Sequence, residues 1–362
     1  MNKLDEARRE IDEADRELAR IFERRMRAAR EIAAYKAGRG LPVPDPAREE
    51  AVLKSRGDAF ENEELAPYYI GFMKDVMKHS RAYQEDLMNG VRVAFCGVEG
   101  AWAYIAAKKI FPAAQTVSFG DFESAYRAVE ASECTLAVLP LENSTAGEVG
   151  QVTDMLFNGT LLITGTYDLP VRHALLGVKG AKKEDIRRVV SHPQALAQCG
   201  EYLKETGWEI TSFANTAMAA RSVAEKGDPT VAAIASPDAA RLYGLEVLEN
   251  SVNEEAQNTT RFAVLSRAAA SPGGKDARSA LTFTVKNEAG SLAKAIGIIG
   301  SHGFNMLELR SRPMKELTWQ YYFFAELEGK VDSPEGEAML SDLSECCDKL
   351  KHLGSYVRRT LD

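Results

Sequence analysis

Apolar residues in the first 88 positions recur with the period of a helix. One row repeats every seven residues, and a second row runs beside it on the same face (Leu4, Ile11, Leu18, Arg25 and Ile32; Ala7, Ala14, Ile21, Ala28 and Tyr35). This heptad pattern predicts a long amphipathic helix with a coiled-coil seam, about 50 Å from Leu4 to Ala37 at ~1.5 Å per residue. Two shorter helices cannot cover such a seam within one chain. The pattern therefore predicts a homodimer or a higher homo-oligomer.

Glycines and prolines end this helix between Gly38 and Pro44. A second helix is expected to begin at Asp45 and Pro46, because aspartate is a favoured N-cap and proline suits the first helical position. A third helix is expected over about residues 67–88. The sequence therefore predicts an all-helical domain over residues 1–89.

Residues 90–268 alternate short apolar runs with helical patterns. The runs expected to form buried strands are Val91–Cys96, Thr135–Leu139, Leu161–Thr164, Arg188–Val190 and Val231–Ala235. This alternation predicts an α/β domain with a largely parallel sheet, and its length suits two lobes with a cleft between them. A last strand is expected to end in residues 258–262.

Small and polar residues mark positions 269–278 as a linker. The remaining positions, 279–362, show the order strand, helix, strand, strand, helix, strand. The expected segments are Ala280–Val285, Ser291–Ser301, Met306–Arg312, Trp319–Leu327, Glu335–Lys349 and Tyr356–Thr360. This βαββαβ order predicts a ferredoxin-like α+β domain.

Composition narrows the range of functions. Apolar residues make up 45% of the chain, which is enough for a globular protein, and 45 basic against 53 acidic residues give a net charge of −8. An acidic chain argues against a nucleic-acid partner, and no run of about 18 apolar residues predicts a membrane span. The odd number of cysteines, the absence of C-x-x-C pairs and the charged N-terminus favour a cytoplasmic protein without a disulfide framework or a zinc site.

Cations lie on the predicted seam of the first helix. Arg25 occupies the heptad row itself, while Arg8 and Lys36 lie in the adjacent row on the same flank. A buried cation is costly unless it is paired. Arg25 could extend to solvent or pair with a glutamate of a partner chain. Three aligned cations favour the alternative, an anionic ligand inside the bundle.

The helical segment resembles the all-helical chorismate mutase family. The residues that carry the resemblance are Arg8, Arg25 and Lys36 on the first helix, Asp45, Arg48 and Glu49 in a D-x-x-R-E motif, and Ser80 and Gln84 one turn apart. The resemblance implies that Asp45 and Ser80 belong to the site. It also implies that Arg25 and Arg48 bind the carboxylates of chorismate, together with Arg8 from a partner subunit.

The same resemblance implies that Lys36 and Gln84 donate to the ether oxygen of chorismate, and that Glu49 holds a substrate hydroxyl. These residue types suit the chemistry. The rearrangement to prephenate is pericyclic, so it needs positioning and charge stabilisation rather than a nucleophile. A guanidinium group binds a carboxylate through two parallel hydrogen bonds.

In the α/β segment, small polar residues stand where predicted strands give way to helices, at residues 97–100, 142–147, 191–194 and 215–216. The free N–H groups of helix N-termini favour carboxylates. Each position could equally be an ordinary helix cap. The positions by themselves leave both interpretations open.

Three motifs resemble prephenate dehydratases: Pro140-Leu141-Glu142-Asn143-Ser144, Ser191-His192-Pro193-Gln194-Ala195 and Thr260-Arg261-Phe262. The resemblance implies that Thr260 donates or relays the proton to the departing hydroxyl of prephenate. Because a threonine hydroxyl is a very weak acid, Glu142 is the predicted assisting acid, with its pKa raised by burial. The substrate-binding residues are expected to be Asn143, Ser144, Ser191, His192, Gln194, Thr216, Arg261 and Phe262. No metal or organic cofactor is expected.

Two alternatives remain for this segment. Where the family commonly has an aromatic-Ser pair after its glycine loop, this chain has Ala103 and Tyr104. The missing hydroxyl would suit a small-anion binding module without turnover, fused to an active mutase. The second alternative is a dehydratase that prefers arogenate, which carries an amino group where the side chain of prephenate has a keto group.

The C-terminal segment resembles the ACT domain of dehydratases, in which phenylalanine binds between two subunits. The expected effector residues are Ala289, Gly290, Ser291, Leu292, Asn305, Arg310, Ser311 and Arg312. Glycine at position 290 permits close approach of a ligand to the backbone. Arg310 reverses the charge of the glutamate usual in the family. The alternative is a dimerisation unit without a ligand.

Overall fold

The computed structural model describes residues 2–39, 41–57, 64–254, 258–270, 276–314 and 320–361. The chain consists of two compact units, Met1–Arg92 and Val93–Asp362. No helix in these described ranges is both long and apolar enough to cross a bilayer.

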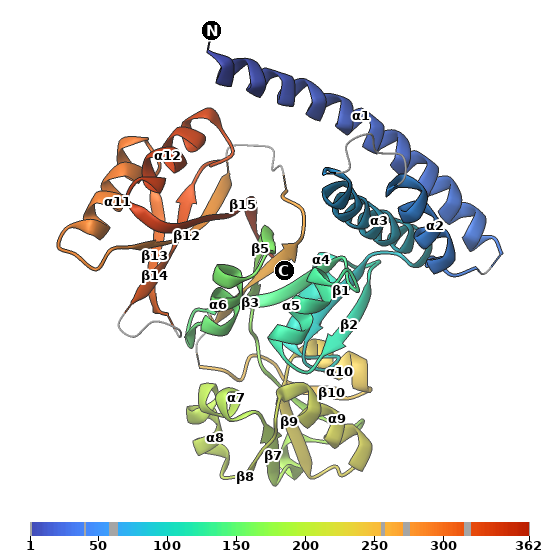
Figure 1. The fold of residues 1–362 in the computed structure, drawn as a ribbon. Coiled ribbons are helices and arrows are strands. Elements are labelled where there is room, and N and C mark those ends of the chain that lie inside the picture. The colour runs from blue at the N-terminus through green and yellow to red at the C-terminus, as the bar shows by residue number, and fades with distance from the viewer. Residues whose placement is uncertain are drawn as a thin grey trace. The chain divides into compact units, whose positions relative to one another are not determined.

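The first unit contains the helices α1 (Lys3–Ala37), α2 (Pro46–Gly57) and α3 (Ala66–Asn89), which confirms the predicted all-helical fold (Figure 1). Asn2 caps α1, because its side-chain oxygen accepts a hydrogen bond from the Asp5 N–H at 3.0 Å. The buried residues of α1 are Ala29 and Ala33, which lie outside the two rows of the predicted seam. Leu4 and Ile11 remain 56% and 60% exposed.

The first lobe of the second unit is an α/β layer. Its strands are β1 (Arg92–Cys96), β2 (Gln115–Phe119), β3 (Leu136–Asn143), β4 (Gly147–Glu148), β5 (Leu162–Pro170) and β11 (Thr259–Ser266); its helices are α4 (Trp102–Ile110), α5 (Phe122–Glu130) and α6 (Gly150–Asn158). Strand β1 is parallel to β3, whereas β11 is antiparallel to both β3 and β5. The prediction of a largely parallel sheet is therefore wrong, because β11 returns from the other lobe in the opposite direction.

The second lobe is inserted between β5 and β11. It has a five-stranded sheet in the order β10-β6-β9-β7-β8, with β6 at Ala174–Gly177, β7 at Arg188–Ser191, β8 at Glu209–Ser212, β9 at Val231–Ala235 and β10 at Glu246–Glu249. Its helices are α7 (Pro193–Gln198), α8 (Gly200–Thr206), α9 (Thr216–Lys226) and α10 (Pro237–Tyr243), after a 3₁₀ turn at Lys183–Asp185. The predicted two-lobed arrangement is confirmed. The sequence did not predict the edge strand β8, because its residues are all exposed and do not form an apolar run.

The C-terminal segment has the predicted βαββαβ order. It comprises β12 (Ala277–Val285), α11 (Ser291–Ser301), β13 (Met306–Pro313), β14 (Tyr321–Glu328), α12 (Pro334–Ser344) and β15 (Cys347–Thr360). The sheet order β13-β14-β12-β15 is antiparallel throughout, as in ferredoxin-like folds. Helix α12 ends before the expected Lys349, because residues from Cys347 onward pair with β12.

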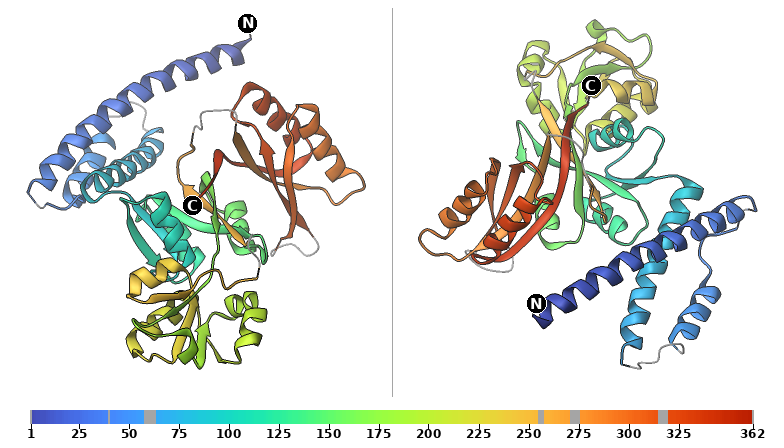
Figure 2. Two further views of the ribbon diagram at one scale, coloured as in Figure 1. Left: turned by 180° about the vertical axis from the view of Figure 1, so that it is seen from behind. Right: turned by 90° about the horizontal axis from the view of Figure 1, so that it is seen from above.

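Strand β15 joins the C-terminal segment to the first lobe. Its last residues pair with β5 in parallel, with Arg358 opposite Thr166, so one ten-stranded sheet runs through both (Figure 2). The sequence predicted a linker at 269–278 and a separate domain after it. Strand β12 already begins at Ala277; residues 271–275 and Trp319 lie outside the described part of the chain.

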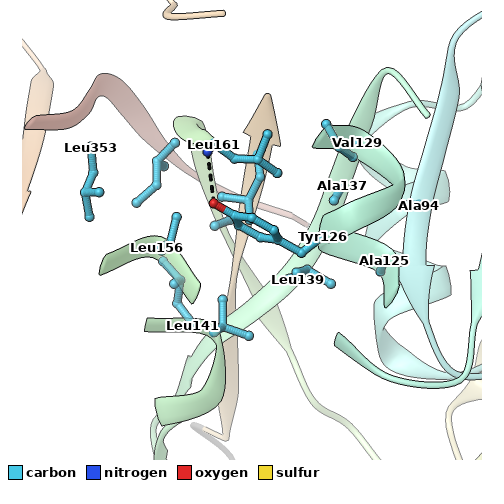
Figure 3. Packing of buried hydrophobic residues seen from close by; sticks show 14 of the residues in the cluster. Ala94, Ala125, Tyr126, Val129, Ala137, Leu139, Leu141, Leu156, Leu161 and Leu353 are labelled. Carbon is cyan, nitrogen blue, oxygen red and sulfur yellow. Dashed lines mark hydrogen bonds between the residues drawn. The ribbon is translucent and has the colours of Figure 1, made fainter. Parts of the chain in front are cut away.

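One core supports the first lobe and the C-terminal strands. Tyr126 lies at its centre among Leu139, Leu156 and Leu161, and the same cluster includes Leu353 of β15 (Figure 3). The Tyr126 hydroxyl accepts a hydrogen bond from the Leu161 N–H at 2.9 Å, and burial raises the pKa of Tyr126 to about 12. The lobe and the C-terminal sheet therefore share buried apolar area.

Candidate active sites

A cavity of about 370 Å³ lies among the three helices of the first unit. Seven of the eight predicted mutase residues line it: Arg25, Lys36, Asp45, Arg48, Glu49, Ser80 and Gln84. The helical period explains this convergence, because positions 25, 28, 29, 32 and 36 share one face of α1, and positions 73, 77, 80 and 84 share one face of α3. Arg8 does not line the cavity of its own chain. It lies seventeen residues before Arg25 on α1, about 26 Å away at ~1.5 Å per residue.

Hydrogen bonds hold several of these side chains in place. Lys36 Nζ donates to the Val43 carbonyl oxygen at 2.6 Å, and Asp45 Oδ1 caps α2 by accepting from the Arg48 N–H at 3.1 Å. Gln84 and Ser80 are buried. Gln84 Nε2 donates to the Ser80 carbonyl at 3.2 Å, and Gln84 Oε1 has no hydrogen-bond partner among the described residues. The amide therefore retains capacity to bind a ligand.

The cavity carries an excess of positive charge. Its four cations are Arg25, Lys36, Arg48 and Arg81, and its two carboxylates are Asp45 and Glu49. Burial lowers the pKa of Arg25, which indicates a cation poorly solvated by water. Two unbalanced positive charges suit a dicarboxylate.

Arg81 was not predicted as a site residue. It forms an ion pair with Glu49, from Arg81 Nη1 to Glu49 Oε2. The available signal was its position next to Ser80, four residues after Met77 and three before Gln84, because this spacing places a side chain on the same helical face.

A second cluster of polar groups lies where β3 ends and β11 begins. Asn143 and Thr260 are directly opposite each other in the β3–β11 ladder. Asn143 Oδ1 accepts hydrogen bonds from the Thr145 and Ala146 N–H groups at 3.1 and 2.8 Å. Because backbone N–H groups can only donate, these bonds establish which side of the Asn143 amide is oxygen.

The Asn143 amide nitrogen then donates to Thr260 Oγ1 at 3.0 Å and to Asn258 Oδ1 at 2.8 Å. Thr260 Oγ1 is therefore an acceptor toward Asn143, and its own hydrogen remains for another acceptor. Asn258 is buried, and its Nδ2 has no hydrogen-bond partner within the described residues. The arrangement makes Thr260 a directed hydrogen-bond donor.

A cavity of about 310 Å³ lies beside this cluster. The first lobe contributes Thr145 and Ala146, the segment between β10 and β11 contributes Asn253, Glu254 and Asn258, and α7 contributes Gln194, Ala197 and Gln198. The predicted residue Gln194 thus lies at the cavity between the lobes.

Other predicted residues of this site have structural contacts. Ser144 Oγ accepts from the Thr259 N–H at 3.0 Å. Ser191 is completely buried and donates to the Ile234 carbonyl at 2.6 Å. His192 caps α7, and Thr216 is the buried first residue of α9. These hydrogen bonds and helix caps stabilise the strand ends and helix starts near the cavity.

The structure contradicts two predictions about the last dehydratase motif, the end of its strand and the role of Phe262. The strand at 258–262 begins at Thr259 rather than ending there, because it pairs with β3 and β5 from that residue onward. Phe262 is 1% exposed and packs in the core, so it is not available to a substrate.

Glu142 does not lie beside Thr260. Successive side chains of a strand point to opposite faces, so Glu142 and Asn143 face opposite ways. Glu142 Oε2 forms ion pairs with Arg261 Nη1 at 3.2 Å and Arg310 Nη2 at 2.7 Å. This geometry contradicts the prediction that Glu142 assists Thr260 as an acid, and it places Arg261 on the wrong face to bind substrate with Thr260.

The ion pairs of Glu142 belong to a larger arginine–carboxylate cluster. Arg261 also meets Asp168 at 3.2 Å and Glu308 at 3.5 Å, and Asp168 accepts from Arg358 Nε at 2.7 Å. The cluster ties β3, β5 and β11 of the first lobe to β13 and β15.

In one chain, the predicted effector residues lie in two places. Leu292 lines a cavity of about 450 Å³, whose wall also includes Glu288 and Tyr321. Gly290 precedes α11 with a φ of +85°, Ala289 is exposed beside it and Ser291 is the first residue of the helix.

The other effector residues lie on β13 or just before it. Ser311 is exposed, and Asn305 Nδ2 donates to Glu328 Oε2 at 3.1 Å. Arg312 Nε pairs with Asp154 Oδ1 of the first lobe at 2.9 Å, and Arg310 pairs with Glu142. Both arginines are thus engaged within the chain.

No group of three or more His, Cys, Asp or Glu side chains in the described ranges is arranged to hold a metal ion.

Family models match both units. The chorismate mutase type II model matches residues 7–85, and the prephenate dehydratase model matches residues 93–270. A bifunctional chorismate mutase/prephenate dehydratase of Neisseria gonorrhoeae is 34% identical over 357 residues, covering 98% of this chain and 97% of the relative. Arogenate dehydratase/prephenate dehydratase 1 of Arabidopsis thaliana is 35% identical over 281 residues, which are 74% of this chain and 72% of the relative.

Solved structures resemble the second unit. Prephenate dehydratase from Arthrobacter aurescens in complex with L-Phe has a TM-score of 0.68 and 26% identity, covering 74% of this chain and 90% of that one. GqqA, described as a novel type of quorum quenching acylase, has the same TM-score with 34% identity over 74% of this chain and 98% of its own. Because the Neisseria relative matches from end to end, this chain belongs to the family of bifunctional chorismate mutase/prephenate dehydratases.

Proposed function

We propose that this chain converts chorismate to prephenate in its helical unit, and prephenate to phenylpyruvate in its two-lobed unit. The observation that carries the proposal is the convergence of seven family residues on one cavity with two unbalanced positive charges, in a chain whose second unit presents an oriented Thr260 hydroxyl.

In the mutase site, binding and charge stabilisation suffice. Arg25 and Arg48 bind the two carboxylates and hold the folded conformer of chorismate. Lys36 and Gln84 stabilise the negative charge that grows on the ether oxygen as the carbon–oxygen bond breaks. Asp45 and Ser80 shape the site, and Glu49 accepts a hydrogen bond from the substrate hydroxyl.

Arg8 reaches this site only from a second subunit. Its distance from Arg25 along α1 separates it from the cavity of its own chain, and the exposed seam provides an apolar surface for another copy of α1. The proposal therefore includes a dimer through the helical unit.

In the dehydratase site, the ring of prephenate loses carbon dioxide and hydroxide. The electrons of the breaking carbon–carbon bond enter the ring as the carbon–oxygen bond breaks, and a proton converts the departing hydroxide to water. Thr260, oriented by Asn143, donates a hydrogen bond to this hydroxyl and relays the proton, which solvent water supplies. Gln194 and Asn258, at the neighbouring cavity, are the proposed partners of the carboxylates.

Site-specific variants test the assignment. With purified protein and chorismate, Thr260→Ala should stop the formation of phenylpyruvate while prephenate accumulates. Arg25→Ala should abolish the consumption of chorismate and leave the turnover of added prephenate intact. Normal mutase rates in both Arg25→Ala and Lys36→Ala would refute the first site.

The same assay separates the two alternatives for the second unit. A binding module without turnover would bind prephenate in calorimetry but release no phenylpyruvate. An arogenate dehydratase would turn over arogenate faster than prephenate, and the name of the Arabidopsis relative includes both substrates.

For residues 279–362 we propose an ACT domain that binds phenylalanine and inhibits dehydration. Its βαββαβ fold, the positive φ of Gly290 and the complex of the Arthrobacter relative with L-Phe support this proposal. Added phenylalanine should lower the dehydratase rate. No binding of phenylalanine in calorimetry would instead indicate a structural dimerisation unit.

A further inference from the structure

We infer that Arg81 is a positioning residue of the mutase site: it neutralises and orients Glu49, so that a carboxylate can serve in a cavity that binds a dianion. This inference rests on the proposed mutase function. It concerns a residue that lies outside the D-x-x-R-E motif and the other positions that carry the family resemblance.

The contact links two helices across the cavity. Arg81 lies on α3 and Glu49 in the first turn of α2, and their side chains line the same cavity. The side chains are 33% and 29% exposed, so the ion pair is partly withdrawn from water. A charge-assisted pair in this setting is stronger than one on the open surface.

The charges of the cavity require such a partner. Glu49 and the substrate carboxylates are all negative, and they would share a cavity of about 370 Å³. Without Arg81, three cations would face two carboxylates, and the excess of positive charge would fall from two to one. Repulsion between Glu49 and the substrate would then be less fully compensated.

The two oxygens of the Glu49 carboxylate have different partners in this proposal. Arg81 Nη1 engages Oε2. Oε1 is then the oxygen that accepts the substrate hydroxyl, in an orientation held by the guanidinium group. Arg81 thus acts on the substrate through Glu49 rather than by direct contact.

Arg30 offers a matched control. It joins α1 to α3 by donating from Nε and Nη2 to the Tyr83 hydroxyl at 3.0 and 2.8 Å, and it does not line the cavity. Arg30→Met therefore removes a guanidinium that links two helices of the same unit without touching the site.

The test compares kcat and KM for chorismate in Arg81→Met, Arg81→Lys, Glu49→Gln, the Arg81→Met/Glu49→Gln double variant and Arg30→Met. Turnover of prephenate by the same preparations reports on the intact second unit, and helical circular dichroism reports on folding of the first. Arg81→Met should lower kcat/KM about ten- to a hundredfold, mostly through KM, as expected for loss of a hydrogen bond to a charged group. Arg81→Lys should recover most of this loss, and Arg30→Met should keep the wild-type value.

The double variant distinguishes positioning from mere stability. If Arg81 acts through Glu49, the double variant should be no slower than Glu49→Gln alone, because there is no carboxylate left to orient. Fully additive losses, or an Arg81→Met loss no larger than that of Arg30→Met, would overturn the inference. An inactive wild-type chain would refute the mutase assignment itself, together with the inference that rests on it.

Discussion

At the scale of single residues, one asparagine organises the dehydratase site. The N–H groups of Thr145 and Ala146 orient the Asn143 amide, and the amide in turn makes Thr260 an acceptor on one side and a donor on the other. Asn143 was predicted to bind substrate. Its hydrogen bonds are already made to the backbone at Thr145 and Ala146 and to Thr260 Oγ1. We therefore propose that Asn143 positions the Thr260 hydroxyl rather than binding the substrate.

Replacement of Asn143 by aspartate tests this role. The new carboxylate still accepts from the backbone N–H groups, but it cannot donate to Thr260, which would turn its hydrogen toward that carboxylate instead of the substrate. We expect the dehydratase kcat to fall about a hundredfold or more, within the range attributed to a positioned proton donor. Asn215→Asp is the control, because Asn215 caps α9 only as an acceptor. Equal kcat values in the two variants would contradict the role.

At the scale of elements, strands β13 and β14 present one face to the first lobe. Arg312 bridges to Asp154 on α6, which also accepts from the Tyr322 hydroxyl at 2.7 Å. The Tyr322 ring stacks on Phe157 with centroids 4.1 Å apart. The ion pair with Asp154 raises the pKa of Arg312 above its already high value, so the guanidinium keeps its charge.

Removal of Arg312 should loosen this docking. Arg312→Met removes the guanidinium that pairs with the half-buried Asp154 carboxylate, and we expect a loss of about 2–3 kcal/mol in the free energy of unfolding of the second unit. The urea midpoint for loss of dehydratase activity would measure it. Arg221→Met is the control, because its pair with Glu225 is 64% and 61% exposed and should contribute about 0–0.5 kcal/mol. A midpoint unchanged from that of the control would show that the docking does not depend on this pair.

At the scale of the whole molecule, the mutase site is expected to need two chains. The apolar seam of α1 is exposed along most of its length, and Arg8 lies far from the cavity of its own chain. A second copy would cover the seam and supply Arg8 at the same time.

Mixing two inactive variants tests this expectation. Homodimers of Arg8→Ala and of Arg25→Ala should each have little mutase activity. A heterodimer of the two would contain one site with both residues intact, so unfolding and refolding a mixture should restore part of the activity. If the mixture remains as inactive as its parents while size measurements show dimers, Arg8 does not act across the interface.

The local patterns of the chain predicted most elements, and the resemblance to the chorismate mutase family named the residues that line the helical cavity. Helical periodicity alone places Arg25 and Lys36 on one face of α1, and Ser80 and Gln84 on one face of α3, because spacing along a helix determines direction. Arg81 has the spacing of this face of α3 but matches no motif, so the sequence did not predict it as a site residue.

What only the tertiary structure decided is which strands become neighbours. The sequence motifs predicted that Glu142 and Thr260 share one site. Side chains alternate between the two faces of the sheet along β3, and Thr260 of β11 lies opposite Asn143, so Glu142 and Thr260 lie on opposite faces of the sheet. Likewise, no local pattern in residues 347–360 predicts that β15 pairs first with β12 and then, through its last residues, with β5. Pairing between strands that are distant in the sequence depends on packing of the whole sheet. The face of a helix on which a residue lies depends only on its spacing from neighbouring residues in the sequence.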